Sequence, residues 1–225
     1  MSNRDNIFKK IRAGLETSAN DSKRRETVGR RIAAQVRHPT PGRVAGKTRQ
    51  QLLTLMRGFL EGQGATVLEA ANRDAVPSLI AKYLRDTNLP AQVRCGDDGR
   101  LAKLPWATEP GLTLTTGRAQ PTDEVGLSHA TACVAETGTL VMASGADNPV
   151  TINFLPENHI VVVDAGDVVG PYEDAWQKIR ARFGKGLMPR TVNMISGPSR
   201  TGDIGGRLVM GAHGPRRLCV IVVRD

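Results

Sequence analysis

Apolar side chains recur every three or four residues in three stretches beyond residue 47, and each stretch predicts a helix. The first stripe predicts a helix that begins at Thr48 and ends near Gly62; it consists of Leu52, Leu53, Met56, Phe59 and Leu60. A second stripe runs from Val76 to Leu84. A third runs from Tyr172 to Phe183, after a Gly-Pro pair of the kind that starts helices.

Short apolar runs between these stripes predict strands at 65–70, 92–95, 112–116, 139–143, 160–164, 192–195 and 218–223. The run 160–164 is apolar up to its final Asp, which is typical of a strand buried on both faces. Residues 125–135 are rich in apolar side chains but follow neither period, and 96–110 are polar and read as a loop. Because strands alternate with helices, we expect a three-layer α/β/α sandwich with a mostly parallel sheet.

The N-terminal part of the chain follows a weaker version of the helical pattern. Ile7, Phe8, Ile11 and Leu15 share one face of residues 3–15, and Val28, Ile32 and Val36 share one face of a second helix. A linker rich in Pro follows at 39–42. We therefore predict a helical arm over residues 1–45 and an α/β domain over residues 46–225.

Charge separates these two parts further. The formal net charge of the 225 residues is +9, and all of it lies in the first 50 residues, with thirteen Lys or Arg against four Asp or Glu; the rest carries eighteen of each. A basic arm can bind nucleic acid, an anionic membrane or an acidic protein, or it can be a solvated helix face. A nucleic-acid-binding module that uses this arm is therefore an alternative function, although nucleic acid is not the partner we expect.

The sequence also indicates where the protein works and what it binds. It contains neither an apolar run of eighteen residues nor an apolar signal core, so we expect a cytoplasmic protein without a membrane span. Cys95, Cys133 and Cys219 are isolated from one another. We expect them to be reduced and buried, and we expect this chain alone to bind no cofactor, iron–sulfur cluster or metal.

The candidate site is a glycine-rich segment, residues 196–215, between two predicted strands. Its glycines allow backbone N–H groups to approach an anion, and its chemistry comes from Ser199, Arg200, Thr201, Asp203 and His213. The alternative is a tight strand-to-helix turn in which Ser199 or Thr201 caps the helix. We expect a helix through Val209 that returns His213 to the carboxyl edge of the sheet, into one cleft with Ser199, Arg200 and Asp203.

Each of these side chains has a functional and a structural interpretation. Arg200 can hold a carboxylate or phosphate, or form a surface ion pair. Asp203 can orient a base or accept a bond from a substrate hydroxyl, or it can be an acid of a first helical turn. His213 can act as acid, base or ligand, or it can fix the turn before the last strand. His159, at the entry to a buried strand, is interpreted as structural.

Three separated motifs carry a family resemblance: Glu136-Thr137-Gly138-Thr139; Leu155-Pro156 with His159-Ile160; and Gly197-Pro198-Ser199-Arg200-Thr201-Gly202-Asp203-Ile204 followed by Gly211-Ala212-His213-Gly214-Pro215. From about Val125 to Val223 the chain resembles the lactate-utilisation protein C family, whose domain is called LUD. It departs from the family at Gly205, where Glu is usual, and at 148–151, where an Arg is usual. The resemblance implies the fold shared by glucosamine-phosphate deaminase (NagB), ribose-phosphate isomerase (RpiA) and coenzyme A transferases.

The resemblance also implies a role in oxidising L-lactate to pyruvate beside iron–sulfur and cysteine-rich proteins. This chain would be the non-redox, cofactor-poor subunit of that L-lactate dehydrogenase complex. It would bind a small carboxylate or anion through Thr137, Gly138, Gly197, Ser199, Arg200 and Thr201, with Glu136, Asp203 and His213 as candidate catalytic residues. By analogy of fold alone, Glu136 could instead be the nucleophile of a coenzyme A transferase. It could also simply accept N–H bonds from the Gly138 turn.

Overall fold

The computed structural model describes residues 3–15, 21–37, 39–184 and 186–224, without the side chains of Asp203 and Ile204. The chain divides into two compact units, Met1–Pro39 and Thr40–Asp225. The first unit holds the two predicted N-terminal helices, α1 (Asn3–Gly14) and α2 (Ser22–Ala34). Within these two described helices no residue is buried, so their apolar stripes are open to solvent.

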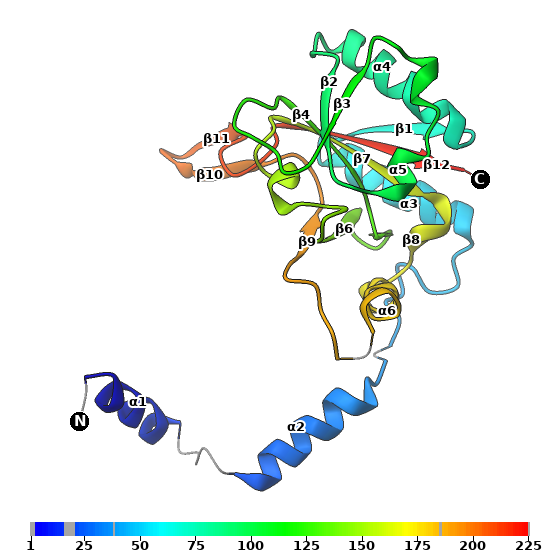
Figure 1. Cartoon of the computed structure of the whole chain (residues 1–225). Helices are drawn as coiled ribbons and strands as arrows, with labels where there is room; N and C mark the ends of the chain where they lie inside the picture. The colour runs from blue at the N-terminus through cyan, green and yellow to red at the C-terminus, as the bar shows by residue number, and fades with distance from the viewer. Residues whose placement is uncertain (1–2, 16–20, 38, 185, 225) are drawn as a thin grey trace. The chain divides into compact units, whose positions relative to one another are not determined.

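The second unit is built on a parallel sheet of six strands in the order β1-β12-β7-β4-β2-β3. Their bounds are β1 Thr66–Ala70, β2 Gln92–Cys95, β3 Thr113–Thr116, β4 Val125–His129, β7 Asn158–Asp164 and β12 Arg217–Val223. The last strand, β12, lies between β1 and β7 and pairs with both in parallel. The expected mostly parallel sheet is confirmed (Figure 1).

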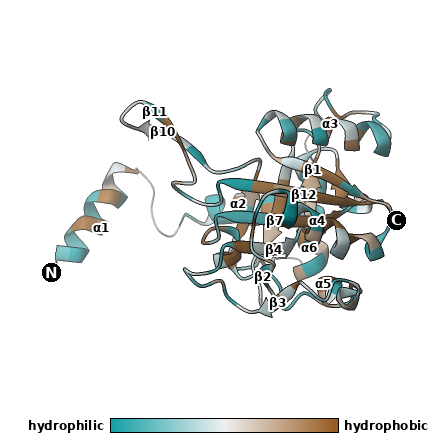
Figure 2. Ribbon diagram, turned by 90° about the horizontal axis from the view of Figure 1, so that it is seen from above, coloured by the Kyte–Doolittle hydropathy of each residue, from teal (hydrophilic) through white to brown (hydrophobic). Residues whose placement is uncertain are grey.

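Helices cover both faces of this sheet, because its strands are apolar on both sides (Figure 2). Side chains of α4 (Val76–Asp86) and α5 (Gly99–Ala102) pack with Val93, Val125 and Ile160 on one face. Side chains of α3 (Arg49–Gly62) pack with Val161 and Val220 on the other. Thr48 caps α3 with a capping box, as expected from a helix that begins there.

A second sheet, which the sequence analysis did not foresee, shares the layer of α3. Its four strands, in the order β8-β5-β6-β9, are β5 (Ala132–Val134), β6 (Thr139–Ala143), β8 (Val168–Val169) and β9 (Val192–Ile195). The short turn 135–138 makes β5 and β6 antiparallel. The outer face of this sheet packs against Ala175 and Ile179 of α6 (Tyr172–Phe183).

The predicted helix through Val209 is wrong, because this segment forms a β-hairpin. β10 (Arg200–Ile204) pairs antiparallel with β11 (Arg207–Met210). Gly205 and Gly206 have φ values of 61° and 70°, which is the conformation that two-residue hairpin turns require. Two adjacent glycines therefore favour the hairpin turn over a continuing helix.

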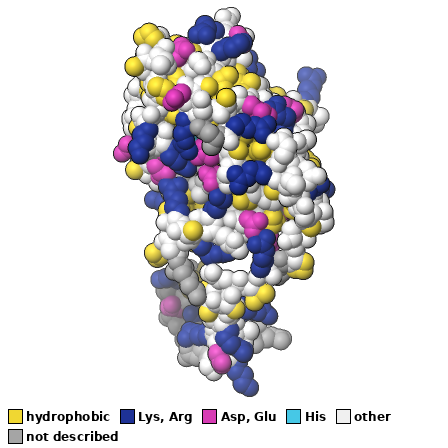
Figure 3. Space-filling model, turned by 90° about the vertical axis from the view of Figure 1, so that its right-hand side faces the viewer, with side chains coloured by type: hydrophobic (Ala, Val, Ile, Leu, Met, Phe, Trp, Pro, Cys, Tyr) yellow, Lys and Arg dark blue, Asp and Glu magenta, His cyan; other side chains and the backbone are white. Residues whose placement is uncertain are grey.

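The surface of the α/β unit carries charges of both signs. Figure 3 shows one face of the molecule, on which Lys and Arg side chains lie among Asp and Glu side chains. Glu69 of β1, for example, forms ion pairs with both Arg57 and Arg224. No helix of the described residues is both long enough and apolar enough to cross a bilayer.

Candidate functional site

The glycine-rich loop lies at the amino edge of the central sheet, so the expected position at the carboxyl edge is wrong. Ser199 donates its N–H to the carbonyl of Pro215, which lies two residues before β12. The cavity beneath the loop is lined by His159 and Leu218, which are the second residues of β7 and β12. The prediction failed because β9, the strand before the loop, belongs to the second sheet and not to the parallel one.

A network of four hydroxyl groups joins this loop to the Glu136–Thr139 turn. Thr139 Oγ1 lies 2.8 Å from Ser196 Oγ and 2.9 Å from the hydroxyl of Tyr172. Thr137 Oγ1 contacts both Thr139 (2.6 Å) and Tyr172 (2.9 Å). Two motifs that are far apart in the sequence therefore form one polar cluster.

The turn itself is fixed by Gly138 against α3. Gly138 has a φ of 64°, and a Cβ atom there would lie 2.6 Å from Cβ of Phe59. The backbone of Glu136 donates to the carbonyl of Gly170 and accepts from Arg43. Among the described residues the Glu136 carboxylate has no hydrogen-bond partner, so the interpretation in which it accepts N–H bonds from the Gly138 turn is wrong.

The loop closes over a cavity of about 190 Å³ that brings together part of the predicted site. It is lined by Asn153, Phe154, His159, Met194, Ile195, Ser196, Gly197, Pro198, Ser199, His213, Gly214, Pro215 and Leu218. Ser199 and His213 thus share one cavity, and Ser199 Oγ accepts the backbone N–H of His213 at 3.2 Å. The His213 side chain is exposed.

Two of the predicted anion-binding residues of this loop, Arg200 and Thr201, are not among the described residues that line the cavity. Arg200 donates to the backbone carbonyl and to the side-chain oxygen of Gln63, at the end of α3. Thr201 is buried in β10. The side chain of Asp203 lies outside the described residues. The predicted cleft therefore contains Ser199 and His213 without the Arg200 guanidinium.

Sequence reasoning underestimated His159, which lines the cavity and is 1% exposed. Its Nε2 lies 3.0 Å from Ser128 Oγ, and Ser128 donates its hydroxyl to Asn153 Oδ1 at 3.4 Å. Because that hydroxyl proton goes to Asn153, Nε2 carries the proton of the neutral ring and Nδ1 is an acceptor. Burial lowers the pKa of His159 to about 4, which keeps the ring neutral.

This chain of hydrogen bonds leaves two buried nitrogens without partners among the described residues, His159 Nδ1 and Asn153 Nδ2. The first is an acceptor and the second a donor. Buried polar atoms usually have a partner in the protein, in ordered water or in a ligand. One unpaired donor and one unpaired acceptor of the same network thus belong to residues that line the cavity.

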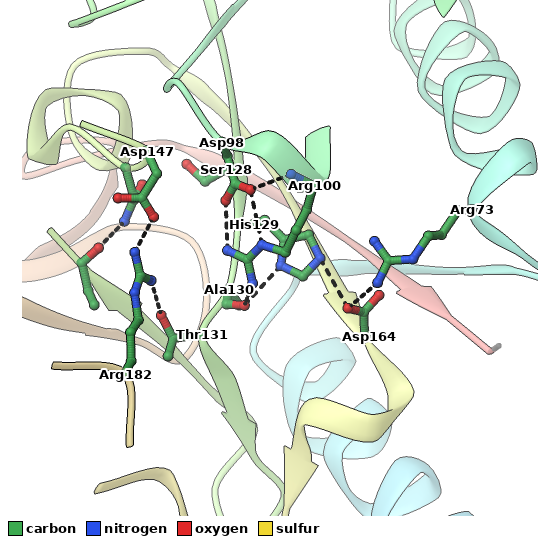
Figure 4. Close-up of polar contacts among 12 residues, drawn as sticks. Arg73, Asp98, Arg100, Ser128, His129, Ala130, Thr131, Asp147, Asp164 and Arg182 are labelled. Carbon is green, nitrogen blue, oxygen red and sulfur yellow. Dashed lines mark hydrogen bonds and ion pairs between the residues drawn. The ribbon is translucent and has the colours of Figure 1, made fainter. Parts of the chain in front are cut away.

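A second polar cluster occupies the carboxyl edge of the central sheet, where the first was expected (Figure 4). His129 ends β4, and its Nε2 lies 3.5 Å from Oδ2 of Asp164, which ends β7. Arg73, which follows β1, binds the same oxygen at 2.6 Å. Asp98, after β2, binds the side chain of Arg100 through both carboxylate oxygens. The available signal was that Arg73, Asp98 and Asp164 end or closely follow predicted strands, whereas His129 lies in residues 125–135, which the sequence pattern did not assign.

The charges of this second cluster compensate one another. Burial alone would raise the pKa of Asp98, but hydrogen bonds from Arg100 outweigh it and lower that pKa below its ordinary value. The pKa of Asp164 is also lowered, because contacts with His129 and Arg73 outweigh its burial. Such paired charges hold the ends of neighbouring strands in place.

The three cysteines are free and buried, as predicted, and lie in β2, β5 and β12. Burial raises the pKa of all three thiols, to about 12 for Cys219, so they stay protonated. Within the described ranges, no group of three or more His, Cys, Asp or Glu is placed to hold a metal ion.

Comparison with known proteins identifies relatives of the α/β unit. The family model described as the LUD domain matches residues 56–223. Lactate utilization protein C of Shouchella clausii is 35% identical over 102 residues, which are 45% of this chain and 44% of that protein. Lactate utilization protein C of Geobacillus thermodenitrificans is 38% identical over 102 residues, with 45% and 42% covered. The alignment thus spans less than half the length of these relatives.

One solved structure has a similar fold. The crystal structure of a DUF162 family protein from Deinococcus radiodurans superposes with a TM-score of 0.58 at 23% identity. The match covers 79% of this chain and 99% of that one. At this identity the likeness supports the α/β fold alone.

Proposed function

The chain belongs to the LUD domain family, and from that premise we propose that it takes part in lactate utilisation by binding a 2-hydroxy acid in the amino-edge cavity. The relatives named lactate utilization protein C support this substrate class. The observation that carries the proposal is a pair of buried, unpartnered nitrogens on two residues that line the cavity. Asn153 Nδ2 suits a carboxylate oxygen, and His159 Nδ1 suits the hydroxyl of the same small molecule.

Neutral groups hold the carboxylate in this proposal, since the described residues that line the cavity include neither Lys nor Arg. Ser196 and Ser199 supply further hydroxyls. The exposed imidazole of His213 stands between the cavity and solvent, where it can pass a proton to water. A cavity of about 190 Å³ accommodates a three-carbon acid, since one water occupies roughly 30 Å³ of liquid volume.

Oxidation of lactate to pyruvate releases two electrons and two protons. We assign the electrons to iron–sulfur clusters of partner proteins and the protons to His213 and solvent. This chain then acts as the non-redox subunit that binds and orients the acid. The exposed apolar side chains of α1 and α2, among basic residues, offer such partners a surface on the N-terminal unit.

Calorimetry with the full chain tests the proposal by comparing L-lactate with propionate, which lacks the hydroxyl. We expect L-lactate to bind at least ten-fold more tightly, because propionate leaves the His159 acceptor unpaired. Asn153→Asp should abolish binding, since it replaces the donor by a negative charge. Asn88→Asp makes the same change outside the cavity lining and should leave the affinity unchanged. Equal affinity for the two acids would remove the 2-hydroxy acid from the cavity.

A further inference from the structure

A hollow of about 790 Å³ opens beside the carboxyl ends of β2 and β3. Asp97, just after β2, and Gly117 and Arg118, just after β3, form one wall. Segment 144–151 and Arg190-Thr191, just before β9, contribute the rest. In open α/β sheets ligands bind beyond the carboxyl ends of strands, and small-molecule sites span roughly 300–1,000 Å³.

Two arginines from distant parts of the sequence line this hollow, Arg118 and Arg190. Neither guanidinium has a hydrogen-bond or ion-pair partner among the described residues, and neither is among the residues with a further interaction. Other arginines of the unit do have carboxylate partners, for example Arg94 with Asp123 and Arg182 with Asp147. Asp97 is the one carboxylate of the described lining, so the lining is net positive.

The backbones that carry the two arginines are fixed to one common segment. Ala119, next to Arg118, donates its N–H to Thr151 Oγ1 at 2.9 Å. Thr191, next to Arg190, donates its N–H to Ser144 Oγ at 2.9 Å and accepts the N–H of Ser144 at 2.9 Å. Both arginines therefore start from positions that segment 144–151 determines.

That segment is in turn anchored to the body of the unit. Asn148 is buried, and its Nδ2 donates to the carbonyl of Ala143 at 3.2 Å. Asp147 pairs with Arg182, which also donates to Thr131 (Figure 4). Asp97 donates its N–H to the carbonyl of Ala146 at 3.0 Å. A site held this firmly without a ligand loses little entropy when a ligand binds.

We propose that this hollow binds a small organic phosphate, with Arg118 and Arg190 donating N–H bonds to the phosphate oxygens. Two guanidinium forks suit a dianion with several acceptor oxygens better than a single carboxylate. The side chains of Pro149 and Val150 give the non-polar body of the ligand an apolar wall. No described residue lines both the hollow and the smaller cavity at the amino edge, so this site is independent of the proposed lactate site.

Calorimetry on the full chain at low salt tests the site with adenosine diphosphate and inorganic pyrophosphate as probes. We expect saturable binding of adenosine diphosphate, and at least a ten-fold weaker affinity in Arg118→Ala and in Arg190→Ala. The matched control is Arg85→Ala, because Arg85 is exposed and lies outside the lining. All three variants should melt at the wild-type temperature, since these side chains are exposed.

The two probes separate recognition of the phosphates from recognition of the ligand body. Pyrophosphate should bind more weakly than adenosine diphosphate while losing affinity by the same factor in both variants. The affinity for L-lactate should stay unchanged in Arg118→Ala, which keeps this result apart from the lactate site. If neither probe binds, or if both arginine variants bind as wild type does, the phosphate site does not exist.

Discussion

The side-chain oxygens of Thr139 and Ser196 lie 2.8 Å apart, although 57 residues separate the two along the chain. Thr139 begins β6 and Ser196 directly follows β9, its antiparallel neighbour. Through this contact the Glu136–Thr139 turn positions the loop that covers the amino-edge cavity. A change at the turn should therefore be felt in the cavity.

Thr139→Val should lower the free energy of unfolding by about 1–3 kcal/mol, because it leaves buried hydroxyl groups without their partner. Thr139 is 1% exposed and contacts Thr137, Tyr172 and Ser196. Urea unfolding measures the change. Thr54→Val removes a hydroxyl from the exposed side of α3 and should cost much less. Equal losses in the two variants would show that the hydroxyl network contributes nothing specific.

Gly138→Ala should destabilise the protein more than Gly46→Ala. Both glycines have positive φ values, 64° and 69°, which cost an alanine about 1–2 kcal/mol. At Gly46 nothing lies within 4 Å of the added Cβ, whereas at Gly138 it would meet Phe59 at 2.6 Å. The difference between the two melting temperatures therefore isolates the close approach of the turn to α3. A larger loss in Gly46→Ala would contradict this packing.

His159 should make the protein less stable in mild acid. Its pKa is about 4 in the folded chain against an ordinary 6.5, so between these values only the unfolded chain binds the proton. Stability is therefore full above pH 6.5 and falls as the pH approaches 4, by about 3 kcal/mol. Asp98 and Asp164, whose pKa values are lowered, lose their contribution only below pH 3.8.

Urea unfolding at pH 7 and pH 4.5 measures this effect. His159→Gln should flatten the dependence in that interval, whatever its effect on stability at pH 7. A variant with the same slope as the wild type would show that another group binds the proton.

Residues 40–225 should fold with the melting temperature of the full chain, because no residue of α1 or α2 is buried. A shorter fragment, 46–225, should melt lower. It lacks Val44, which is 4% exposed and lies 3.4 Å from where a Cβ of Gly170 would be, and Arg43, which binds the Glu136 carbonyl. Circular dichroism of the two fragments checks both expectations. A fragment 40–225 that fails to fold would show that the N-terminal unit supports the domain.

Periodicity alone predicted most elements of the parallel sheet and its helices, because strands such as Ile160–Asp164 are apolar on both faces. It could not assign strands to sheets. Residues 125–135 form β4 and β5, which belong to different sheets although every residue of both strands is buried. Which sheet a strand joins depends on its contacts with strands that lie far away in the sequence.

The same limit explains why the sequence predicted only part of the candidate site. The sequence brought Ser199 and His213 together through one glycine-rich segment, and the cavity contains both. It gave little weight to His159 and none to Asn153, because their importance lies in nitrogens left unpaired by a network through Ser128. A hydrogen-bond inventory of this kind needs three-dimensional positions.

The place of β12 between β1 and β7 has a consequence for biosynthesis. Among the described strands β1 pairs with β12 alone, so it cannot pair until residues 217–223 have left the ribosome. Until then the apolar flanks of β1 and β7 are both unpaired in the nascent polypeptide, and unpaired strand edges of this kind promote aggregation. Chaperones that hold nascent chains should therefore matter for its yield, and slower translation of the last strand should lengthen the period of risk.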